Sequence, residues 1–557
     1  MRLAPVVLIL LIALVLFLGL DRVGFTDLRE ARDAQVSREL VSAGEFLVPT
    51  YAREPHFDKP LLAYVPDVLI HRLTPQAPTR SRVLRACLAA FLLLLLASIG
   101  AQHFGSRAGW WAAIVLASTP VLPLAARTDG TQLLGSLLGW VGFAGLADAL
   151  FGRRAGRDLR LLVTYGALAA ALLMAGPLPA LWPLGGLMLY LRLSGSRDGY
   201  LRTRPLAGLM LMAGVGLPWY GAAIERYGIA FLSHAPFFPY GVEPRGPWFA
   251  GPLLALSILV IGFYPWSALL PEAALHASTG WRFARRRAAA TDPPSAAASP
   301  APDSRPTDNS GPLSRERRDE DAAHFFIAGM VAALLPVALY PGAPLPAVLP
   351  ALPAAALLCG RLIDHLFEDP ARLARPLARA SLMLALVGSA LGLLLALAAS
   401  RLEVAAAPLR LLAAVTFGTA WLPFLAGLRG RRRLGAALMA LPVALGAPIV
   451  SLRLLPAMEE YFNARTVAEA MNQASPPQAP LARLAPDLPS LRLYCRHNVV
   501  GVDSLGAREV SDLRAADGMV YLVFQSGNES EIARTAATPI EIMRRTPSLV
   551  LARIAGP

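Results

Sequence analysis

The sequence FTDLREARDAQVSRELVSAGEFLVPTYAREPHFDKPLLAY, from Phe25 to Tyr64, is a polar insertion after a hydrophobic N-terminal run. It concentrates acidic, arginine and aromatic side chains, and it contains Lys59, the only lysine among 557 residues. An ammonium is a compact point charge, which binds phosphate differently from a planar guanidinium. We interpret Lys59 as a candidate phosphate ligand; the alternative is a lysine without a special role.

The composition places this insertion in a membrane protein. The chain is 55% hydrophobic and 16% charged, with a mean hydropathy of +0.49, which is too apolar for a soluble protein of this length. Residues 1–20 contain an apolar run of about 18 residues. No small-residue cleavage site precedes Asp21, so this run is interpreted as a retained membrane helix and not as a signal peptide.

Apolar segments of membrane-spanning length recur along the rest of the chain. Together with the first run they predict an all-α polytopic membrane protein with about thirteen transmembrane helices. The further segments lie at residues 83–100, 109–126, 131–149, 159–175, 177–192, 206–224, 250–270, 325–340, 344–363, 377–398, 408–428 and 433–450.

Arginines indicate how the chain crosses the membrane. They gather in alternate loops, which marks those loops as cytoplasmic and places the N-terminus on the same side. The loop at residues 21–82 is then external. Arg80, Arg82 and Arg85 contradict the rule, and we interpret them as possible phosphate ligands at the outer surface. The cytoplasmic group comprises Arg153, Arg154, Arg157, Arg160, Arg192, Arg197, Arg202, Arg204, Arg282, Arg285, Arg286, Arg287, Arg429, Arg431, Arg432 and Arg433.

Two further regions differ from the spans in composition. Residues 271–323 are rich in Pro, Ala, Ser and Arg and are predicted to form a flexible cytoplasmic loop. Residues 458–557 are predicted to form a small external α/β domain behind a transmembrane domain at 1–457. Its strands are predicted at 491–495, 499–502, 519–524 and 549–554, and its helices at 508–516 and 529–536.

Cofactors and nucleic acid find little support in the sequence. The net charge of +14 is explained by arginine in cytoplasmic loops, so no nucleic-acid partner is expected. The cysteines Cys87, Cys359 and Cys495 have no metal-binding or disulfide spacing. His56 with Asp58 is a conceivable pair of metal ligands, but two residues do not make a site. The sequence therefore predicts no cofactor, and it leaves open whether a divalent metal is bound.

Three acids in the external loops are candidates for chemistry. Asp27 and Glu30 precede a predicted helix that ends near Ala43, where they could form a capping box or act on a substrate. Asp129 lies between two predicted spans and could cap the second or meet a cationic pocket. In the loop at 225–249, the aromatic residues are typical of a membrane interface. His234, Glu243 and Arg245 of that loop are candidate cavity residues.

The order of these motifs resembles a known family. After the first span come a charged helix with A-x-x-S-R-E-L, a G-E-F-L-V-P turn and then K-P-L-L-x-Y. This order resembles the polyprenyl-phosphate-sugar-dependent glycosyltransferases of the GT-C type, such as lipid A aminoarabinose transferase and bacterial relatives of protein O-mannosyltransferases. The resemblance is best over the first 270 residues and weaker to about residue 360.

The family's motifs are only partly kept. Its D-E-x-R-Y-A pattern falls on residues 29–34, which retain Glu30 and Arg32 but carry Arg29 at the position of the proposed catalytic acid and Asp33 at that of the tyrosine. Asp27 or Asp33 could then supply the missing acid. The Y-x-E-K-P motif falls on residues 56–60 and keeps the lysine. Two later family lysines are replaced by Ala175 and Ala343.

The resemblance implies a membrane glycosyltransferase. It would move a sugar from a polyprenyl (undecaprenyl) phosphate donor to a lipid, glycan or protein acceptor on the periplasmic face of a bacterial inner membrane. The implied catalytic candidates are Asp129, Glu30, Asp27 and Asp33. The implied ligands of the donor phosphate are Lys59, Arg32 and Arg29, and the implied acceptor or cavity residues are His56, Asp58, Tyr64, His234, Glu243 and Arg245.

Two alternatives stay open at this point. The first is a catalytically degenerate relative that binds lipid-linked sugar or supports another enzyme, because several motif residues are changed. The second is a transporter, which would call for paired broken helices, charges at mid-membrane and an internal repeat. The polar residues instead concentrate in external loops.

Overall fold

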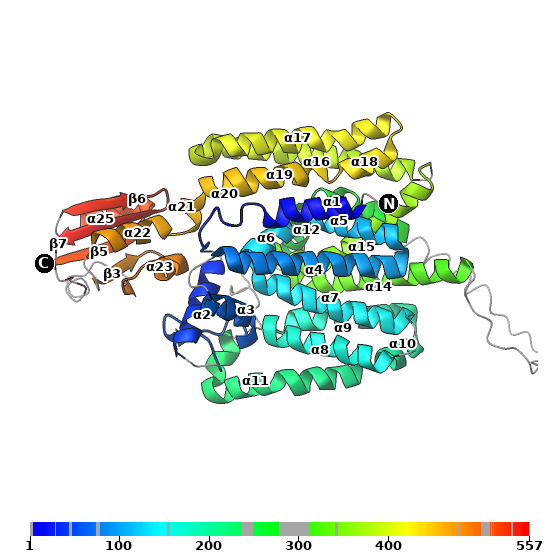
Figure 1. Ribbon diagram of the computed structural model, residues 1–557, viewed down its shortest axis with the longest axis horizontal. Helices are drawn as coiled ribbons and strands as arrows, with labels where there is room; N and C mark the ends of the chain where they lie inside the picture. The colour runs from blue at the N-terminus through cyan, green and yellow to red at the C-terminus, as the bar shows by residue number, and fades with distance from the viewer. Residues whose placement is uncertain are drawn as a thin grey trace, which may run out of the picture.

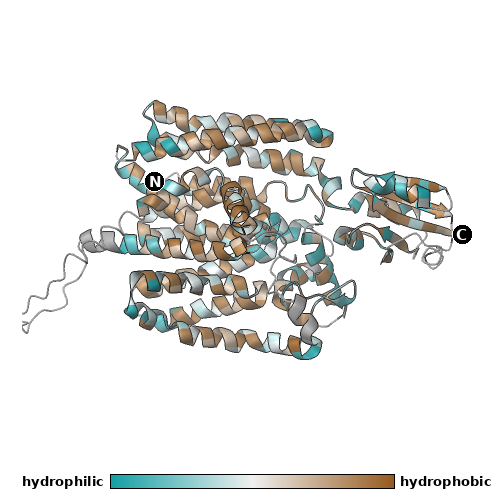
Figure 2. Ribbon diagram, turned by 180° about the vertical axis from the view of Figure 1, so that it is seen from behind, coloured by the Kyte–Doolittle hydropathy of each residue, from teal (hydrophilic) through white to brown (hydrophobic). Residues whose placement is uncertain are grey.

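The protein consists of a helical bundle, a polar layer at one end of it and a small domain beyond that layer (Figure 1). The computed structural model describes residues 4–27, 29–43, 47–73, 78–152, 156–234, 249–277, 312–339, 343–371, 373–475, 479–502, 513, 515, 517–535 and 539–555. Figure 2 shows hydrophobic residues along the bundle helices and hydrophilic residues concentrated toward the polar layer and the small domain.

Within the described ranges, nine helical segments are long and apolar enough to cross a membrane, or eleven if each of two bent pairs counts as one span. Two more of the expected spans correspond to shorter or less apolar helices: α1 (Ala4–Ile12) with η1 (Ala13–Phe17), and α9 (Pro177–Ser194). The prediction of an all-α polytopic membrane bundle is confirmed, and its count of about thirteen stays a prediction. The other bundle helices are α4 (Pro78–Phe104), α5 (Ser106–Ala117), α6 (Val121–Thr128), α7 (Gly130–Phe151), α8 (Arg157–Ala175), α10 (Arg197–Thr203), α11 (Pro205–His234), α12 (Ala250–Gly262), η3 (Trp266–Ala268), α14 (Pro312–Leu339), η4 (Leu345–Ala351), α15 (Leu352–Glu368), α16 (Ala374–Arg401), η5 (Glu403–Ala405), α17 (Ala406–Leu428), α18 (Arg432–Leu438), α19 (Leu441–Ile449), η6 (Val450–Leu454) and α20 (Leu455–Ala457).

Small residues let these helices approach closely. A Cβ atom at Gly109 would lie 2.2 Å from the carbonyl oxygen of Ala97, and one at Gly360 would lie 2.6 Å from that of Ala108. Helices in a bilayer pack mainly through such close contacts, because lipid tails are as apolar as leucine. The glycines therefore fix α5 between α4 and α15 at the centre of the bundle.

Two predicted loops are shorter than expected. Residues 312–323 form the first turns of α14 and not a loop, because their Leu, Arg, Glu and Ala residues favour helix and extend it beyond the apolar span. The central part of that predicted loop, 278–311, lies outside the described residues. Residues 225–234 likewise continue α11, with a kink at Gly228, where φ is 58°.

The polar layer is built from the insertion after the first span. It contains α2 (Glu30–Ala43), the two-stranded β1 (Thr50–Tyr51) and β2 (Glu54–Pro55), η2 (Leu61–Ala63) and α3 (Val65–Leu73). The helix predicted to end near Ala43 is confirmed as α2. Glu39 holds the hairpin turn, because its carboxylate accepts hydrogen bonds from the amides of Ala52 (2.9 Å) and Arg53 (3.1 Å).

The small domain has a mixed sheet in the order β4-β3-β5-β7-β6, in which β3 is parallel to both neighbours and the other pairs are antiparallel. The predicted strands at 499–502, 519–524 and 549–554 are confirmed as β4, β5 and β7, and the helix at 529–536 as α25. The elements are α21 (Glu459–Phe462), α22 (Arg465–Ala474), β3 (Leu481–Leu484), α23 (Pro489–Tyr494), β4 (Val499–Gly501), β5 (Met519–Gln525), η7 (Ser526–Asn528), α25 (Glu529–Thr535), β6 (Ile540–Arg545) and β7 (Leu549–Ala555).

One predicted strand is wrong. Of the predicted residues 491–495, all but Cys495 belong to helix α23, which begins with Pro489 in its first turn. Leu491 and Leu493 are both buried, so their alternation imitates a strand, but they face different neighbours: Leu491 the domain core and Leu493 a cluster that includes Phe25. The predicted helix at 508–516 lies almost entirely outside the described residues.

Candidate active site

Helix α2 begins with a carboxylate that satisfies the backbone before it. The amide of Thr26 donates a hydrogen bond to Oε2 of Glu30 (3.2 Å), and the Thr26 hydroxyl donates to the same oxygen (3.4 Å). This is the capping role predicted for Glu30. The capping role predicted for Asp27 is wrong, because the Asp27 carboxylate accepts hydrogen bonds from Ser490 of α23 instead.

Glu30 is also the centre of a buried ion-pair network. Its side chain is 0% exposed and accepts two hydrogen bonds from Arg82, at 2.8 Å from Nε and 2.7 Å from Nη2. Arg85 approaches the same carboxylate at 3.4 Å and also reaches Asp67. A buried charge must be paired and fully hydrogen-bonded. Arg82 further donates to the carbonyl oxygens of Leu20, Val23 and Gly24.

This network corrects the interpretation of the arginines at the start of α4. Arg82 and Arg85 are 4% and 5% exposed, so they do not lie at the outer surface as phosphate ligands; their charges are compensated inside the protein. The exception to the arginine rule therefore has an internal cause. Arg80, by contrast, is exposed.

Lys59 is held by Asp33. Its Nζ lies 2.7 Å from both carboxylate oxygens of Asp33, and both residues are buried. The ammonium also lies 5.8 Å from the centre of the Tyr64 ring, a distance at which a cation is attracted to an aromatic face. Burial, followed by the nearby charges of Asp33 and Asp58, raises the pKa of Tyr64 well above its usual value. Tyr64 is therefore neutral at physiological pH.

A second, more open group lies beside Lys59. Arg32 Nη1 and His56 Nε2 each lie 3.3 Å from Oδ2 of Asp58. Burial by itself would raise the pKa of Asp58, but His56, Arg32 and Lys59 outweigh it and hold that pKa well below its usual range. Arg32 and Asp58 are about one-third exposed, at 36% and 35%, so this pair is the more accessible part of the cluster.

Asp129 connects the second external loop to α2. Its Oδ1 accepts a hydrogen bond from the amide of Gln132 (3.1 Å), so it caps α7 as predicted. Its Oδ2 pairs with Nη1 of Arg29 at 3.2 Å, and the carboxylate is only 2% exposed. The next residue, Gly130, leaves room for Arg85, because a Cβ there would lie 2.9 Å from Nε of Arg85. One acid therefore both caps a helix and faces the cationic cluster.

Arg127 is a buried cation beside the polar cluster that the sequence did not reveal. It is buried within the bent pair α5–α6, and its guanidinium donates to the carbonyl oxygens of Val15 (3.1 Å) and Leu18 (2.9 Å) and to the Ser451 hydroxyl (3.2 Å). Val15 and Ser451 lie in the π-helical turns η1 and η6 of the first and last spans. Arg127 thus joins the first and last spans to α6, two residues before Asp129.

The small domain is attached to α2 by polar contacts. Asp27 accepts hydrogen bonds from the amide (2.5 Å) and hydroxyl (2.6 Å) of Ser490, and Nη2 of Arg38 donates to the carbonyl oxygen of Leu493 (2.6 Å). The hydroxyl of Tyr51 donates to Asp487. Burial raises the pKa of Asp27 to about 6, although the hydrogen bonds from Ser490 act in the opposite direction.

The Asp27 contact predicts a pH-dependent stability. Because the folded-state pKa is raised from 3.8 to about 6, its stabilising contribution is complete below pH 3.8 and is lost as the pH rises through 6. The loss amounts to up to about 3 kcal/mol. Asp27→Asn should remove this dependence, so its melting temperature relative to wild type should rise between pH 4 and pH 7. Parallel melting curves across this range would contradict the prediction.

The structure thus brings most predicted site residues together. Arg29, Glu30, Arg32, Asp33, His56, Asp58, Lys59, Tyr64 and Asp129 form one polar cluster at the end of the bundle. Asp27 turns away from it toward the small domain. His234 ends α11 without a described side chain, and Glu243 and Arg245 lie outside the described residues. In the described part of the chain, no three His, Cys, Asp or Glu residues are placed to hold a metal ion.

The bundle, the polar first loop and the mixed-sheet domain together have the GT-C fold of membrane glycosyltransferases. In particular, the chain is similar to the structure of ArnT from Cupriavidus metallidurans bound to undecaprenyl phosphate, with a TM-score of 0.74 and 18% identity over 99% of this chain and 97% of that chain. The apo structure of the same protein gives a TM-score of 0.73 and 17% identity, with 99% and 97% coverage.

A more distant likeness is to the archaeal oligosaccharyltransferase AglB from Archaeoglobus fulgidus in complex with an inhibitory peptide and a dolichol-phosphate. The TM-score is 0.50 and the identity 12%, over 96% of this chain and 71% of that chain. Comparison of the sequence with family models found no match, and comparison with curated proteins found none either. The predicted fold class is confirmed by these structures.

Proposed function

We propose that the protein is a membrane glycosyltransferase that moves a sugar from a polyprenyl phosphate, such as undecaprenyl phosphate, to an acceptor hydroxyl. The observation that carries the proposal is the convergence of the single lysine, Lys59, with acids and arginines in one cluster on a GT-C fold. The structures that share the fold were solved with undecaprenyl phosphate and with dolichol-phosphate, which supports a donor of this class.

In this mechanism, the acceptor oxygen forms a bond to the anomeric carbon while the bond from that carbon to the phosphate oxygen breaks. The electron pair leaves with the polyprenyl phosphate, and Lys59, Arg32 and Arg29 stabilise the growing negative charge. The acceptor proton passes to a carboxylate. We assign this role to Asp129, because it pairs with one arginine, Arg29, whereas the carboxylate of Glu30 is held by both Arg82 and Arg85. Asp33 would release Lys59 when the donor phosphate binds.

We place the cluster on the periplasmic side of a bacterial inner membrane, with the N-terminus in the cytoplasm. The arginine-rich loops support this orientation, since they alternate with the loops that form the polar layer. We further propose that the transmembrane domain spans residues 1–457 and that residues 458–557 form a periplasmic domain. The acceptor would be a lipid, a glycan or a protein that reaches the cluster between these domains.

A panel of radiolabelled polyprenyl-phosphate sugars, incubated with membranes that contain the protein, tests the proposal. Label should leave at least one donor with wild type. Lys59→Ala should bind that donor about 10- to 100-fold more weakly, because one charged hydrogen bond to phosphate is lost. Lys59→Arg should restore part of the affinity. Arg22→Ala, an exposed residue in the same loop, serves as the control and should behave like wild type.

A second candidate is a degenerate relative that binds lipid-linked sugar without transferring it. The observation that favours it is the neutralisation of both key groups, since Lys59 is paired with Asp33 and Asp129 with Arg29. This candidate predicts Lys59-dependent donor binding with no transfer from any sugar in the panel. Equal transfer by wild type and Lys59→Ala would instead refute the proposed role of Lys59.

A further inference from the structure

A cavity lies at the end of the bundle remote from the polar cluster. Helices α16, α17 and α18 line a partly open cavity of ≈ 260 Å³ there, near the start of α16 and the end of α17. Figure 1 shows α18 at the opposite end of the bundle from the small domain. The cavity therefore cannot belong to the proposed transfer site.

Two guanidinium groups line this cavity. Arg375 is exposed, and Arg432 is half-buried and donates one hydrogen bond to the carbonyl oxygen of Pro370 (2.8 Å). Neither is ion-paired with a carboxylate in the described part of the chain, whereas the neighbouring Arg379 is paired with Glu272 at 3.0 Å. Two uncompensated cations at one cavity favour an anionic ligand.

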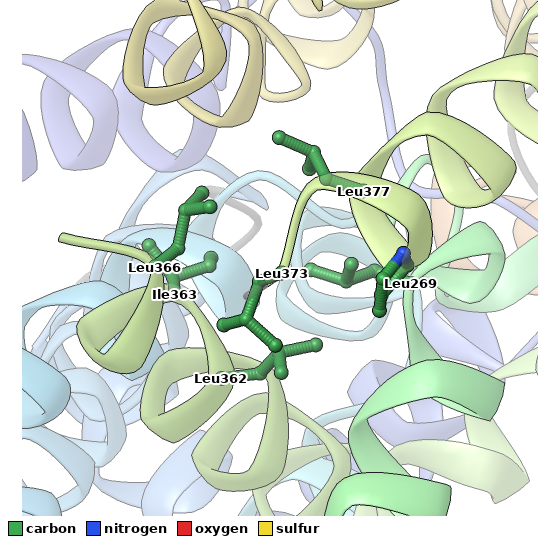
Figure 3. Close-up of a pocket in the computed structure, with 7 residues that line it drawn as sticks. Leu269, Leu362, Ile363, Leu366, Leu373 and Leu377 are labelled. Carbon is green, nitrogen blue, oxygen red and sulfur yellow. The ribbon is translucent and has the colours of Figure 1, made fainter. Parts of the chain in front are cut away.

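The remaining walls are mostly apolar. Phe424 and Leu428 of α17 and Leu377 of α16 line the cavity, together with Ser381, whose hydroxyl is bonded to the carbonyl oxygen of Ala378. A second cavity, wholly apolar but only ≈ 10 Å³ in volume, adjoins it through Leu377, which lines both. Figure 3 shows leucine and isoleucine side chains around this second cavity, among them Leu269, Leu362, Ile363, Leu366 and Leu373. The site is thus cationic on one side and hydrocarbon-like on the other.

We propose that this cavity binds an anionic glycerophospholipid. The phosphate would lie between Arg375 and Arg432, and one acyl chain would follow Phe424 and Leu428 along α17. Basic pockets between transmembrane helices bind lipid headgroups in this way. A zwitterionic lipid would bind less well, because its own cation competes with the two guanidinium groups.

Full-length protein in nanodiscs of phosphatidylcholine, with or without phosphatidylglycerol, tests the proposal. Native mass spectrometry should detect retained phosphatidylglycerol, and its presence should raise the melting temperature. Arg375→Gln and the double variant Arg375→Gln/Arg432→Gln should each bind this lipid at least about tenfold more weakly than wild type. The matched control is Arg401→Gln/Arg410→Gln, which removes two exposed arginines from the ends of α16 and α17 that lie away from the cavity.

A cavity-filling variant separates a built site from general surface charge. An added Cβ at Gly427 would meet no atom within 4 Å, so Gly427→Phe can place a ring in the cavity while both arginines remain. It should reduce phosphatidylglycerol retention as much as Arg375→Gln does. Retention unchanged in all three variants would overturn the proposal. So would equal stabilisation by inorganic phosphate, or displacement of the lipid by undecaprenyl phosphate.

Discussion

Arg82→Met is expected to destabilise the protein by about 3–5 kcal/mol, the effect of breaking a buried ion pair by removing one partner. Glu30 would keep its charge at 0% exposure with only Arg85, at 3.4 Å, as a cationic partner. Three carbonyl groups between the first span and α2 would also lose their donor. Methionine is chosen because it retains much of the volume and removes only the charge and the hydrogen bonds.

Thermal and denaturant unfolding in detergent would measure this effect. Arg80→Met is the matched control, because Arg80 lies in the same helix turn but is exposed, and it should change stability by less than about 0.5 kcal/mol. Arg82→Met/Glu30→Gln should recover part of the loss, since the unpaired charge is then removed. If Arg82→Met unfolded at the same point as wild type, the network around Glu30 would not be what holds α2 on the bundle.

Much of the fold follows from local sequence properties. Apolar runs of bilayer length predicted the spans, and β-branched or alternating apolar runs predicted β5 and β7. The secondary-structure prediction failed where tertiary contacts determine the local structure. Leu491 and Leu493 alternate like a strand, yet α23 is stabilised as a helix by packing against α22 on one side and α2 on the other.

The site was predictable in composition but not in pairing. Lys59 was recognisable because no other lysine occurs in the chain, and Asp129 because it stands at the start of a helix. The partners could not be predicted, because contacts such as Asp27 with Ser490 join residues more than 400 positions apart. The sequence did mark Arg82 and Arg85 as unusual, since arginines on the external side contradict the arginine rule. Only the structure shows that both are there to pair with the buried Glu30.

Asp129→Asn is expected to lower kcat for sugar transfer about 10²- to 10⁴-fold, the range for loss of a general base. Asparagine keeps an oxygen that can accept the hydrogen bond from the Gln132 amide, so the cap of α7 and the melting temperature should be nearly unchanged. It removes the carboxylate that pairs with Arg29 but leaves Arg29 itself in place, and the other proposed phosphate ligands are unchanged, so donor binding should be affected much less than turnover.

Single-turnover assays with a labelled donor separate the two effects, because they report chemistry apart from binding. Asp158→Asn is the control: Asp158 is 76% exposed and pairs with Arg204 on the surface, so its loss should leave kcat within about twofold. A loss of donor affinity with unchanged kcat would assign Asp129 to holding Arg29 at the phosphate. Unchanged kcat and affinity together would restrict Asp129 to capping α7. Another base would then have to accept the proton of the acceptor. Asp58, the more exposed acid of the cluster, is the next candidate.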